Sequence, residues 1–245
     1  MNPTDAGKRC IVLGGSGALG SAVCQALAAR GCRVAFTYLT REGPPPTPGA
    51  IARRLDLRSV PDLERVVDEL AAELGGVDAF VQCAGVGVTI ECAGTDSHHR
   101  LPHIDEKAWD WMIDVNVKGT FFAVRRLIGF MRERGGNIVL TGSIDGVKPA
   151  PSPVHYAASK GALQGMTMSM AKELGEFNVR VNLVAPGVMD GGLSRTLPKN
   201  LLDEYKKHCG LRRLGRLQEI AGLMAWLATE NTYVTGQTIV VDGGL

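Results

Sequence analysis

The chain has 245 residues, of which 45% are hydrophobic and 21% are charged, and its formal net charge is +2. This composition predicts a soluble globular protein, and no concentrated basic run suggests a nucleic acid as partner. No apolar stretch has the length of a membrane span, and the N-terminal residues MNPTDAGKRC lack the apolar core of a signal peptide. We therefore expect a cytoplasmic protein that acts on a small molecule and not on a membrane or a nucleic acid.

Strands and helices alternate in the N-terminal half. Short apolar runs at 9–15, 32–39, 51–57 and 77–85 predict buried parallel strands, and the spacing of apolar residues predicts helices over 18–31 and 60–76. The connection TREGPPPTPGA, between the second and third strands, contains four prolines. Proline removes a backbone donor and clashes with the preceding turn, so we expect no crossover helix there.

The C-terminal half continues the alternation after a polar, irregular stretch. Residues 86–104 predict a long loop near the pocket, 106–136 one long helix and 152–176 another, with strands at 137–143, 179–186 and 238–244. Residues 189–213 mix leucines with lysines, and the family resemblance given below implies a mobile lid there. The whole chain, 1–245, therefore predicts one α/β domain: a doubly wound, Rossmann-like parallel sheet with helices on both faces.

A glycine-rich turn, GGSGALG, follows the first predicted strand and begins the first predicted helix. Gly15, Gly17 and Gly20 fit one dinucleotide-binding pattern, whereas Gly14, Ala18 and Gly20 fit a wider one. Both patterns need small residues, because the turn is sharp and the backbone must approach a pyrophosphate at the helix N-terminus. The loop predicts a dinucleotide site made of Gly14, Ser16, Gly17, Ala18, Leu19 and Gly20.

The end of the second predicted strand bears on the choice of cofactor. An NAD-binding protein places a carboxylate there, about 20 residues beyond the loop, to bind the ribose 2′-hydroxyl. This chain has Tyr38, and Arg41 follows three residues later. A guanidinium suits a 2′-phosphate, so NADP(H) is favoured over NAD(H) as cofactor, although the nearby Glu42 keeps NAD(H) open.

The sequence YAASK places Tyr156 and Lys160 four residues apart, and therefore on one face of a predicted helix. A free phenol, with a pKa of about 10, is a poor base, and a neighbouring ammonium is expected to favour its phenolate form. Ser143 ends a predicted strand 13 residues earlier, where its hydroxyl can hydrogen-bond a developing alkoxide. Alone, the pair of Tyr156 and Lys160 could also be two unrelated side chains on a helix surface, so its assignment to proton transfer depends on the rest of the chain.

Taken together, these motifs resemble the short-chain dehydrogenase/reductase family. The resemblance runs from residue 9 to 244 and also includes CAG at 83–85, VNVKG at 115–119, NLVAPG at 182–187 and VDGG at 241–244. It implies hydride transfer between a nicotinamide and a carbonyl or secondary alcohol, with Tyr156 as proton donor or acceptor. The catalytic residues that it implies are Asn116, Ser143, Tyr156 and Lys160.

The resemblance also implies cofactor contacts and partners. Asp56 and Leu57 match residues near the adenine, Ala84 and Gly85 match the floor of the cofactor site, and Tyr156 and Lys160 face the cofactor. Pro186, Gly187, Val188 and Met189 match the segment beside the nicotinamide. The pattern is most similar to the 3-oxoacyl-carrier-protein reductase branch, which implies a 3-oxoacyl thioester on acyl carrier protein or CoA, or a small or cyclic ketone, as substrate. Helices over 108–134 and 154–175 are expected to pair into a homodimer or homotetramer.

Three positions depart from the family pattern. Gln82 and Cys83 replace a pair of asparagines, and Gly191 replaces a threonine or serine that contacts the cofactor, a role that Ser194 or the backbone can take over. These departures motivate an alternative: a catalytically silent regulatory protein of the same fold that senses the dinucleotide. The four catalytic residue types argue against this alternative, because a sensor does not need them.

Two other groups of reactive side chains have simpler interpretations. Asp96, His98, His99 and His103 lie in the irregular stretch without a fixed frame, and we expect no metal there. Six cysteines show no C-x-x-C spacing and are expected to be reduced thiols. Asp242 is expected to have a packing role only.

Overall fold

The computed structural model describes residues 7–40, 47–87, 101–149 and 152–245. Seven parallel strands form one sheet in the order β3-β2-β1-β4-β5-β6-β7. The strands are β1 (Arg9–Leu13), β2 (Arg33–Tyr38), β3 (Ile51–Arg54), β4 (Ala79–Gln82), β5 (Gly136–Thr141), β6 (Val179–Pro186) and β7 (Thr238–Val241). This sheet and its helices on both faces confirm the predicted fold class.

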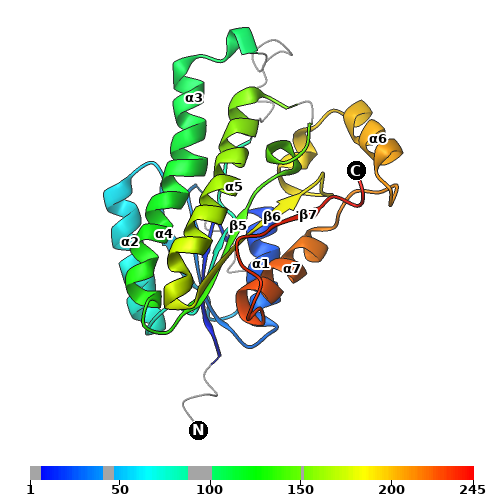
Figure 1. Ribbon diagram of the computed structural model, residues 1–245. Coiled ribbons are helices and arrows are strands. Elements are labelled where there is room, and N and C mark those ends of the chain that lie inside the picture. Colours follow the sequence, from blue (N-terminus) through cyan, green and yellow to red (C-terminus); the bar gives the residue numbers. More distant parts are fainter. Residues whose placement is uncertain (1–6, 41–46, 88–100, 150–151) are drawn as a thin grey trace.

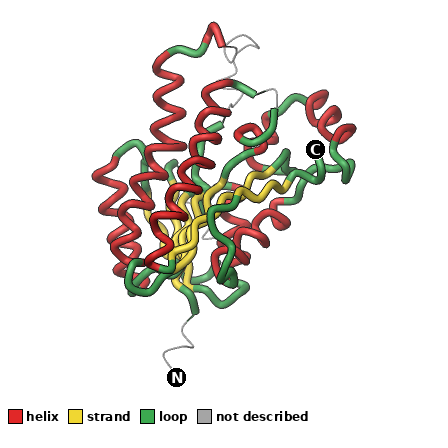
Figure 2. The backbone as a smooth tube through the Cα atoms, viewed as in Figure 1, coloured by secondary structure: helices red, strands yellow, loops and turns green. Residues whose placement is uncertain are grey.

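Helices cover both faces of the sheet (Figures 1 and 2). On one face lie α1 (Ala18–Ala28) and α7 (Leu217–Thr229), and on the other lie α2 (Val60–Leu74), α4 (Gly119–Met131) and α5 (Val154–Leu174). α3 (Glu106–Ile113) continues beyond α4, and α6 (Lys199–His208) lies near the C-terminus. Helix α7 was not predicted from the sequence. It packs with α1 over one face of the sheet and forms an apolar core there. No helix among the described residues is long and apolar enough to span a bilayer.

The predicted single helix over 106–136 was wrong in one respect. Between α3 and α4 the chain forms a π-helical turn, Asp114–Lys118, with Asn116 buried inside it. The Asn116 side chain bonds the backbone of Val86 in both directions, through Val86 N and Val86 O, each at 2.9 Å. A π turn redirects side chains within a helix, and such turns are frequent at functional sites.

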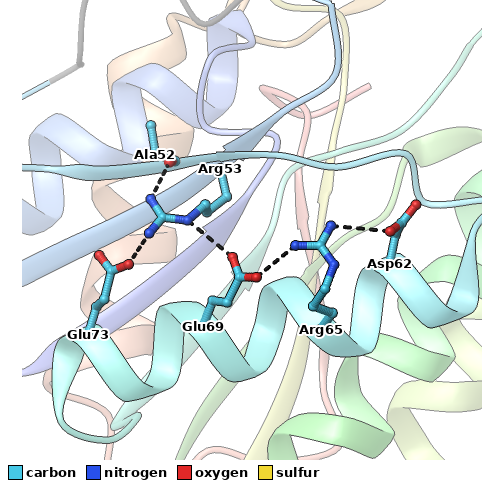
Figure 3. Close-up of polar contacts among 6 residues, drawn as sticks. All are labelled: Ala52, Arg53, Asp62, Arg65, Glu69 and Glu73. Atoms are coloured by element: carbon cyan, nitrogen blue, oxygen red, sulfur yellow. Dashed lines mark hydrogen bonds and ion pairs between the residues drawn. The ribbon is translucent and has the colours of Figure 1, made fainter.

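The described part of the connection between β2 and β3 contains no helix, as its prolines predicted. Edge strand β3 is instead tied to α2 by polar contacts (Figure 3). Arg53 pairs with Glu69 and Glu73, and Arg65 continues the chain of charges by bridging Glu69 (2.7 Å) and Asp62 (3.2 Å). Exposed pairs of this kind contribute little to stability individually, but together they hold the edge strand β3 against α2.

Candidate active site

The strand order reverses between β1 and β4, because the chain runs outward from β1 in one direction and from β4 in the other. At such a switch point the loops after neighbouring strands separate and leave a crevice at the carboxyl ends. The loop after β1 begins at Gly14, the loop after β4 contains Ala84 and Gly85, and Ser143 lies just beyond β5. The predicted cofactor and catalytic residues therefore meet at one edge of the sheet.

The glycine loop is packed too closely for larger side chains. Gly14 has a φ of +74°, and a Cβ added there would lie 2.7 Å from the Cα of Ala84. A Cβ on Gly20 would overlap the carbonyl oxygen of Gly14, whereas one on Gly17 would meet only that oxygen, at 3.3 Å. The first turn of α1 has neither a side-chain cap nor an acidic residue, so its N–H groups suit a diphosphate. In this loop Ser16, Gly17 and Ala18 are exposed, and Leu19 and Gly20 are buried.

The end of β2 carries no carboxylate among the described residues. Tyr38 is half-buried, and its carbonyl accepts a hydrogen bond from Leu55 N at 2.8 Å. The exposed Arg54, on the neighbouring strand, donates from Nε to the carbonyl of Leu39 at 2.9 Å. Sequence reasoning missed Arg54, because only strand pairing brings it beside Tyr38. The predicted contact Arg41 lies outside the described residues.

The two predicted adenine contacts differ in character. Asp56 pairs with Arg58 at 2.6 Å, and the hydrogen bonds from this guanidinium lower the pKa of the Asp56 carboxyl. Leu57 is buried, and its Cβ would lie 2.8 Å from a Cβ added to Gly119. Leu57 thus packs mainly into the core, and Asp56 offers the accessible polar group.

The floor of the crevice links the cofactor loop to the catalytic residues. A Cβ on the exposed Gly85 would lie 3.1 Å from Asn116 Oδ1 and 3.7 Å from Lys160 Nζ. Gln82 replaces the family asparagine but still bonds backbone, because its Nε2 donates to the carbonyl of Ala84. Burial raises the pKa of the Cys83 thiol to about 12, so that thiol stays protonated.

Asn116 joins three segments of the site. Besides its two bonds to Val86, its Nδ2 lies 3.0 Å from Ser159 Oγ and 3.2 Å from Met112 Sδ. Ser159 precedes Lys160 on α5 and in turn donates to the carbonyl of Tyr156 at 2.8 Å. Asn116 therefore positions α5 relative to the loop after β4.

Lys160 is a buried ammonium at the inner end of the site. Its Nζ donates to the carbonyl of Thr141 at 3.0 Å. Burial lowers the pKa of Lys160 to about 8, although the nearby Asp145 and Cys83 oppose the shift. Its charge is therefore sensitive to pH near neutrality.

Tyr156 differs from the sequence-based expectation in its electrostatics. Burial raises the pKa of Tyr156 to about 12, a hydrogen bond with Ser143 opposes the shift, and the charge of Asp145 adds to it. The expected stabilisation of a phenolate by Lys160 is outweighed, since Nζ lies 5.8 Å from the centre of the ring and the desolvation of the phenolate dominates. The hydroxyl consequently keeps its proton at neutral pH, as a proton donor requires.

Ser143 has a neighbour that sequence reasoning missed. Ser143 Oγ donates to Asp145 Oδ2 at 2.6 Å and accepts from Asp145 N at 3.3 Å. Both residues belong to the short 3₁₀ turn Ile144–Gly146 and its cap. A carboxylate two positions after a catalytic serine is the only sequence signal that pointed to this contact.

The segment after β6 contains the residues predicted to lie beside a nicotinamide and continues into the predicted lid. Pro186 ends β6, and Gly187 N donates to Val241 O at 3.0 Å. Val188 and Met189, both half-buried, continue the chain, and Met189 N donates to Ser194 Oγ at 3.2 Å. The Ser194 hydroxyl thus bonds the backbone of its own segment.

The same segment approaches both sides of the crevice. A Cβ on Gly192 would lie 3.5 Å from Ala18, at the start of α1. A Cβ on Gly87 would lie 2.8 Å from Leu193 and 3.7 Å from the ring of Tyr156. Helix α6 is anchored by Tyr205, whose hydroxyl donates to Asp242 O at 2.8 Å. This segment therefore lies close to both α1 and Tyr156.

The remaining predicted groups lie away from this chemistry. Among the described cysteines Cys10, Cys24 and Cys209 are buried, Cys32 and Cys83 are half-buried, and all five are free thiols, as predicted. His103 is exposed, whereas Asp96, His98, His99 and Cys92 lie outside the described residues. Asp242 pairs with Lys148 at 2.5 Å, in line with a packing role. The described residues include no group of three or more His, Cys, Asp or Glu that could hold a metal ion.

Comparisons with known proteins agree with this geometry. The family model described as enoyl-(acyl carrier protein) reductase matches residues 15–245. The chain is 31% identical to a 3-oxoacyl-acyl-carrier-protein reductase of Thermotoga maritima over 98% of each chain. It is 32% identical to one of Mus musculus, over 97% of this chain and 98% of that relative. A solved short-chain dehydrogenase/reductase from Serratia marcescens is 30% identical over 97% of both chains, with a TM-score of 0.86. The chain therefore belongs to the short-chain dehydrogenase/reductase family of oxidoreductases.

Proposed function

We propose that this oxidoreductase moves a hydride between NADP(H) and a carbonyl or secondary alcohol, with Asn116, Ser143, Tyr156 and Lys160 as its catalytic residues. The observation that carries the proposal is the convergence of the Tyr156 hydroxyl, hydrogen-bonded to Ser143, with the buried Lys160 beside the floor of a glycine-lined crevice. A regulator that only senses the cofactor has no use for this proton-transfer geometry.

In the direction of reduction, a bound reduced nicotinamide would supply the hydride to the carbonyl carbon. The Tyr156 hydroxyl gives its proton to the carbonyl oxygen, and Ser143 hydrogen-bonds the same oxygen as negative charge develops on it. The Lys160 ammonium lies behind Tyr156 and favours the phenolate that remains. Asn116 holds Val86 and Ser159, and so fixes the distance between the crevice floor and the catalytic helix.

NADP(H) is the proposed cofactor because positive charge borders the end of β2. Arg54 is exposed beside the backbone of Leu39, and the carboxylate of Asp56 is already paired with Arg58. A 2′-phosphate would therefore meet guanidinium groups and no unpaired carboxylate among the described residues. Arg41, which the sequence also suggested as a contact, is part of the same proposal.

For the substrate, we propose a ketone or a 3-oxoacyl thioester on acyl carrier protein or CoA. The names of the relatives support the thioester. An acidic carrier protein would bind best to a surface with unpaired positive charges. On α4 two arginines are already paired, Arg125 with Glu64 and Arg126 with Asp68, each at 2.5 Å. A small-molecule carbonyl therefore remains the broader proposal.

We also propose that residues 1–245 form one cytoplasmic domain with a lid over 189–213, and that the protein is a homodimer or homotetramer. Apolar side chains on α3, α4 and α5 are more than 40% exposed, namely Trp109, Phe121, Val154 and Met168. Helix faces of this kind are typical of contacts between subunits. Sedimentation analysis tests this part: a monomer at micromolar concentration would refute it.

A substrate panel with NADPH and NADH tests the proposed function. The purified protein should consume NADPH faster than NADH in the presence of ketones and 3-oxoacyl thioesters, and a 2-enoyl thioester should serve as the comparison for carbon–carbon reduction. Faster turnover of the enoyl compound would refute carbonyl reduction. Tight binding of NADPH without turnover of any carbonyl would favour the silent regulator instead.

A further inference from the structure

Asp145 places a carboxylate one hydrogen bond away from the position where a substrate oxygen would react. Its Oδ2 accepts the hydrogen of Ser143 Oγ at 2.6 Å, and Ser143 is also hydrogen-bonded to Tyr156. Asp145 is only half-buried, so its second oxygen is within reach of a bound molecule. The reaction as described above has no role for this charge.

The hydroxyl of Ser143 has a single hydrogen, and two acceptors compete for it. While Ser143 donates to Asp145, it cannot donate to the oxygen of a substrate carbonyl. A hydrogen bond to a carboxylate is stronger than one to a neutral carbonyl, so a simple ketone competes poorly. A substrate that brought its own donor to Asp145 would release Ser143 for the carbonyl.

Asp145 has no direct ion pair among the described residues, and the buried Lys160 ammonium is the cation whose charge interacts with it. Lys148, the nearest lysine along the chain, pairs with Asp242 instead. A carboxylate without a direct ion-pair partner beside a developing alkoxide opposes the reaction, because like charges at short distance repel. A positive group on the substrate would remove that penalty.

We propose that Asp145 selects carbonyl substrates with an ammonium or hydroxyl group on the carbon next to the carbonyl, and the corresponding vicinal amino alcohols or diols in the reverse direction. The donor binds Asp145 while the neighbouring carbonyl oxygen binds Ser143 and Tyr156, which are themselves adjacent in the site. This inference rests on the proposed function and narrows its substrate class. A 3-oxoacyl thioester, which has no such donor, should be a poorer substrate.

Matched ketones test the selection directly. Butanone, hydroxyacetone and aminoacetone differ only in the group beside the carbonyl, and propiophenone with its α-hydroxy and α-amino acetophenone counterparts repeats the series on a larger ketone. With NADPH saturating, kcat/KM of the wild-type protein should be at least about tenfold higher for the amino ketone than for the unsubstituted one, and intermediate for the hydroxy ketone. Equal values, or the reverse order, would overturn the proposal.

Asp145→Asn should reduce this preference about tenfold or more, because the neutral amide no longer attracts the ammonium. The same variant should reduce the unsubstituted ketone faster than the wild type does, since Ser143 is released from the carboxylate. Glu133→Gln removes an exposed negative charge after α4 and should leave the preference unchanged. An equal loss for all three ketones in Asp145→Asn would mean that Asp145 only supports Ser143, and would also overturn the proposal.

NADPH binding, followed by its fluorescence, separates these outcomes from misfolding, and Asp145→Ala replaces the first variant if that variant does not bind. Failure of the whole ketone series while another carbonyl is reduced would reject the role of Asp145 and leave the proposed function intact. Failure of every carbonyl would reject the proposed function itself.

Discussion

The proposed cofactor side of the crevice consists mainly of backbone and glycines, whereas the proposed substrate side consists of polar and charged side chains. On the cofactor side, backbone and glycines lie so close together that Gly14 and Gly20 leave no room for a Cβ. On the substrate side, polar and charged side chains of two elements meet, with Asp145 against Ser143 and Tyr156. The first side constrains residue size, and the second constrains charge. Changes in size should therefore impair cofactor binding, whereas changes in charge should alter chemistry and choice of substrate.

The largest effect is expected on the substrate side. Tyr156→Phe removes the hydroxyl that gives its proton to the carbonyl oxygen, and should lower kcat by roughly 10² to 10⁴-fold. NADPH affinity should change little, because the ring and the glycine loop remain. Stopped-flow turnover together with a fluorescence titration of NADPH measures both quantities. Turnover near the wild-type rate would contradict the role assigned to Tyr156.

The cofactor side should respond to a single methyl group. Gly14→Ala and Gly31→Ala share a left-handed backbone, with φ of +74° and +76°, so each should lose about 1 kcal/mol of stability from that strain. Only the Cβ at position 14 collides with Ala84, whereas the one at position 31 meets nothing within 4 Å. Gly14→Ala should therefore cost a further 1–3 kcal/mol or so and abolish NADPH binding.

Urea unfolding and NADPH titration of both variants make this comparison. The Gly31→Ala protein serves as the control and should bind NADPH like the wild type. Equal stability and equal NADPH affinity in the two variants would show that the close packing of the glycine loop against Ala84 is unimportant.

A change of pH should have a smaller effect, through the charge of Lys160. Its pKa of about 8 lies below that of an ordinary lysine, so the ammonium is present below pH 8 and is lost as the pH rises through that value. The kcat/KM for NADPH, which reports groups of the free enzyme, should fall over the same range. The Lys160→Arg variant keeps a positive charge at high pH. Its kcat/KM for NADPH should therefore fall less at alkaline pH, whatever its overall rate. If kcat/KM of that variant falls at alkaline pH as it does in the wild type, the titrating group is not Lys160.

The smallest effect is expected at the exposed end of β2. Arg54→Ala should raise KM for NADPH about fivefold and leave KM for NADH nearly unchanged, because a solvent-exposed charge contact is worth about 1 kcal/mol. Arg65→Ala, on the exposed face of α2, is the matched control. An equal rise in KM for both cofactors would indicate loss of structure and no contact with the 2′-phosphate.

The sequence predicted the sheet because buried parallel strands and glycine turns depend on local patterns that the chain shows directly. It did not predict the π turn around Asn116, since the apolar spacing continues through it and its cause is a tertiary bond to Val86. The pKa of Tyr156 was likewise expected in the wrong direction, because desolvation depends on packing that spacing does not reveal. Ser143 was recognised by its position, but the hydrogen bond to Asp145 required coordinates.

The pair of hydrogen bonds between Asn116 and Val86 also marks a practical boundary for engineering. Because this amide clamps the backbone from both sides, the chain leaves β4 along a fixed path as far as that residue. A loop from another reductase grafted between Gly87 and Leu101 would start from a defined anchor. Replacements beyond Val86 can therefore be designed from a fixed starting point, while the bond between Asn116 and Ser159 stays in place.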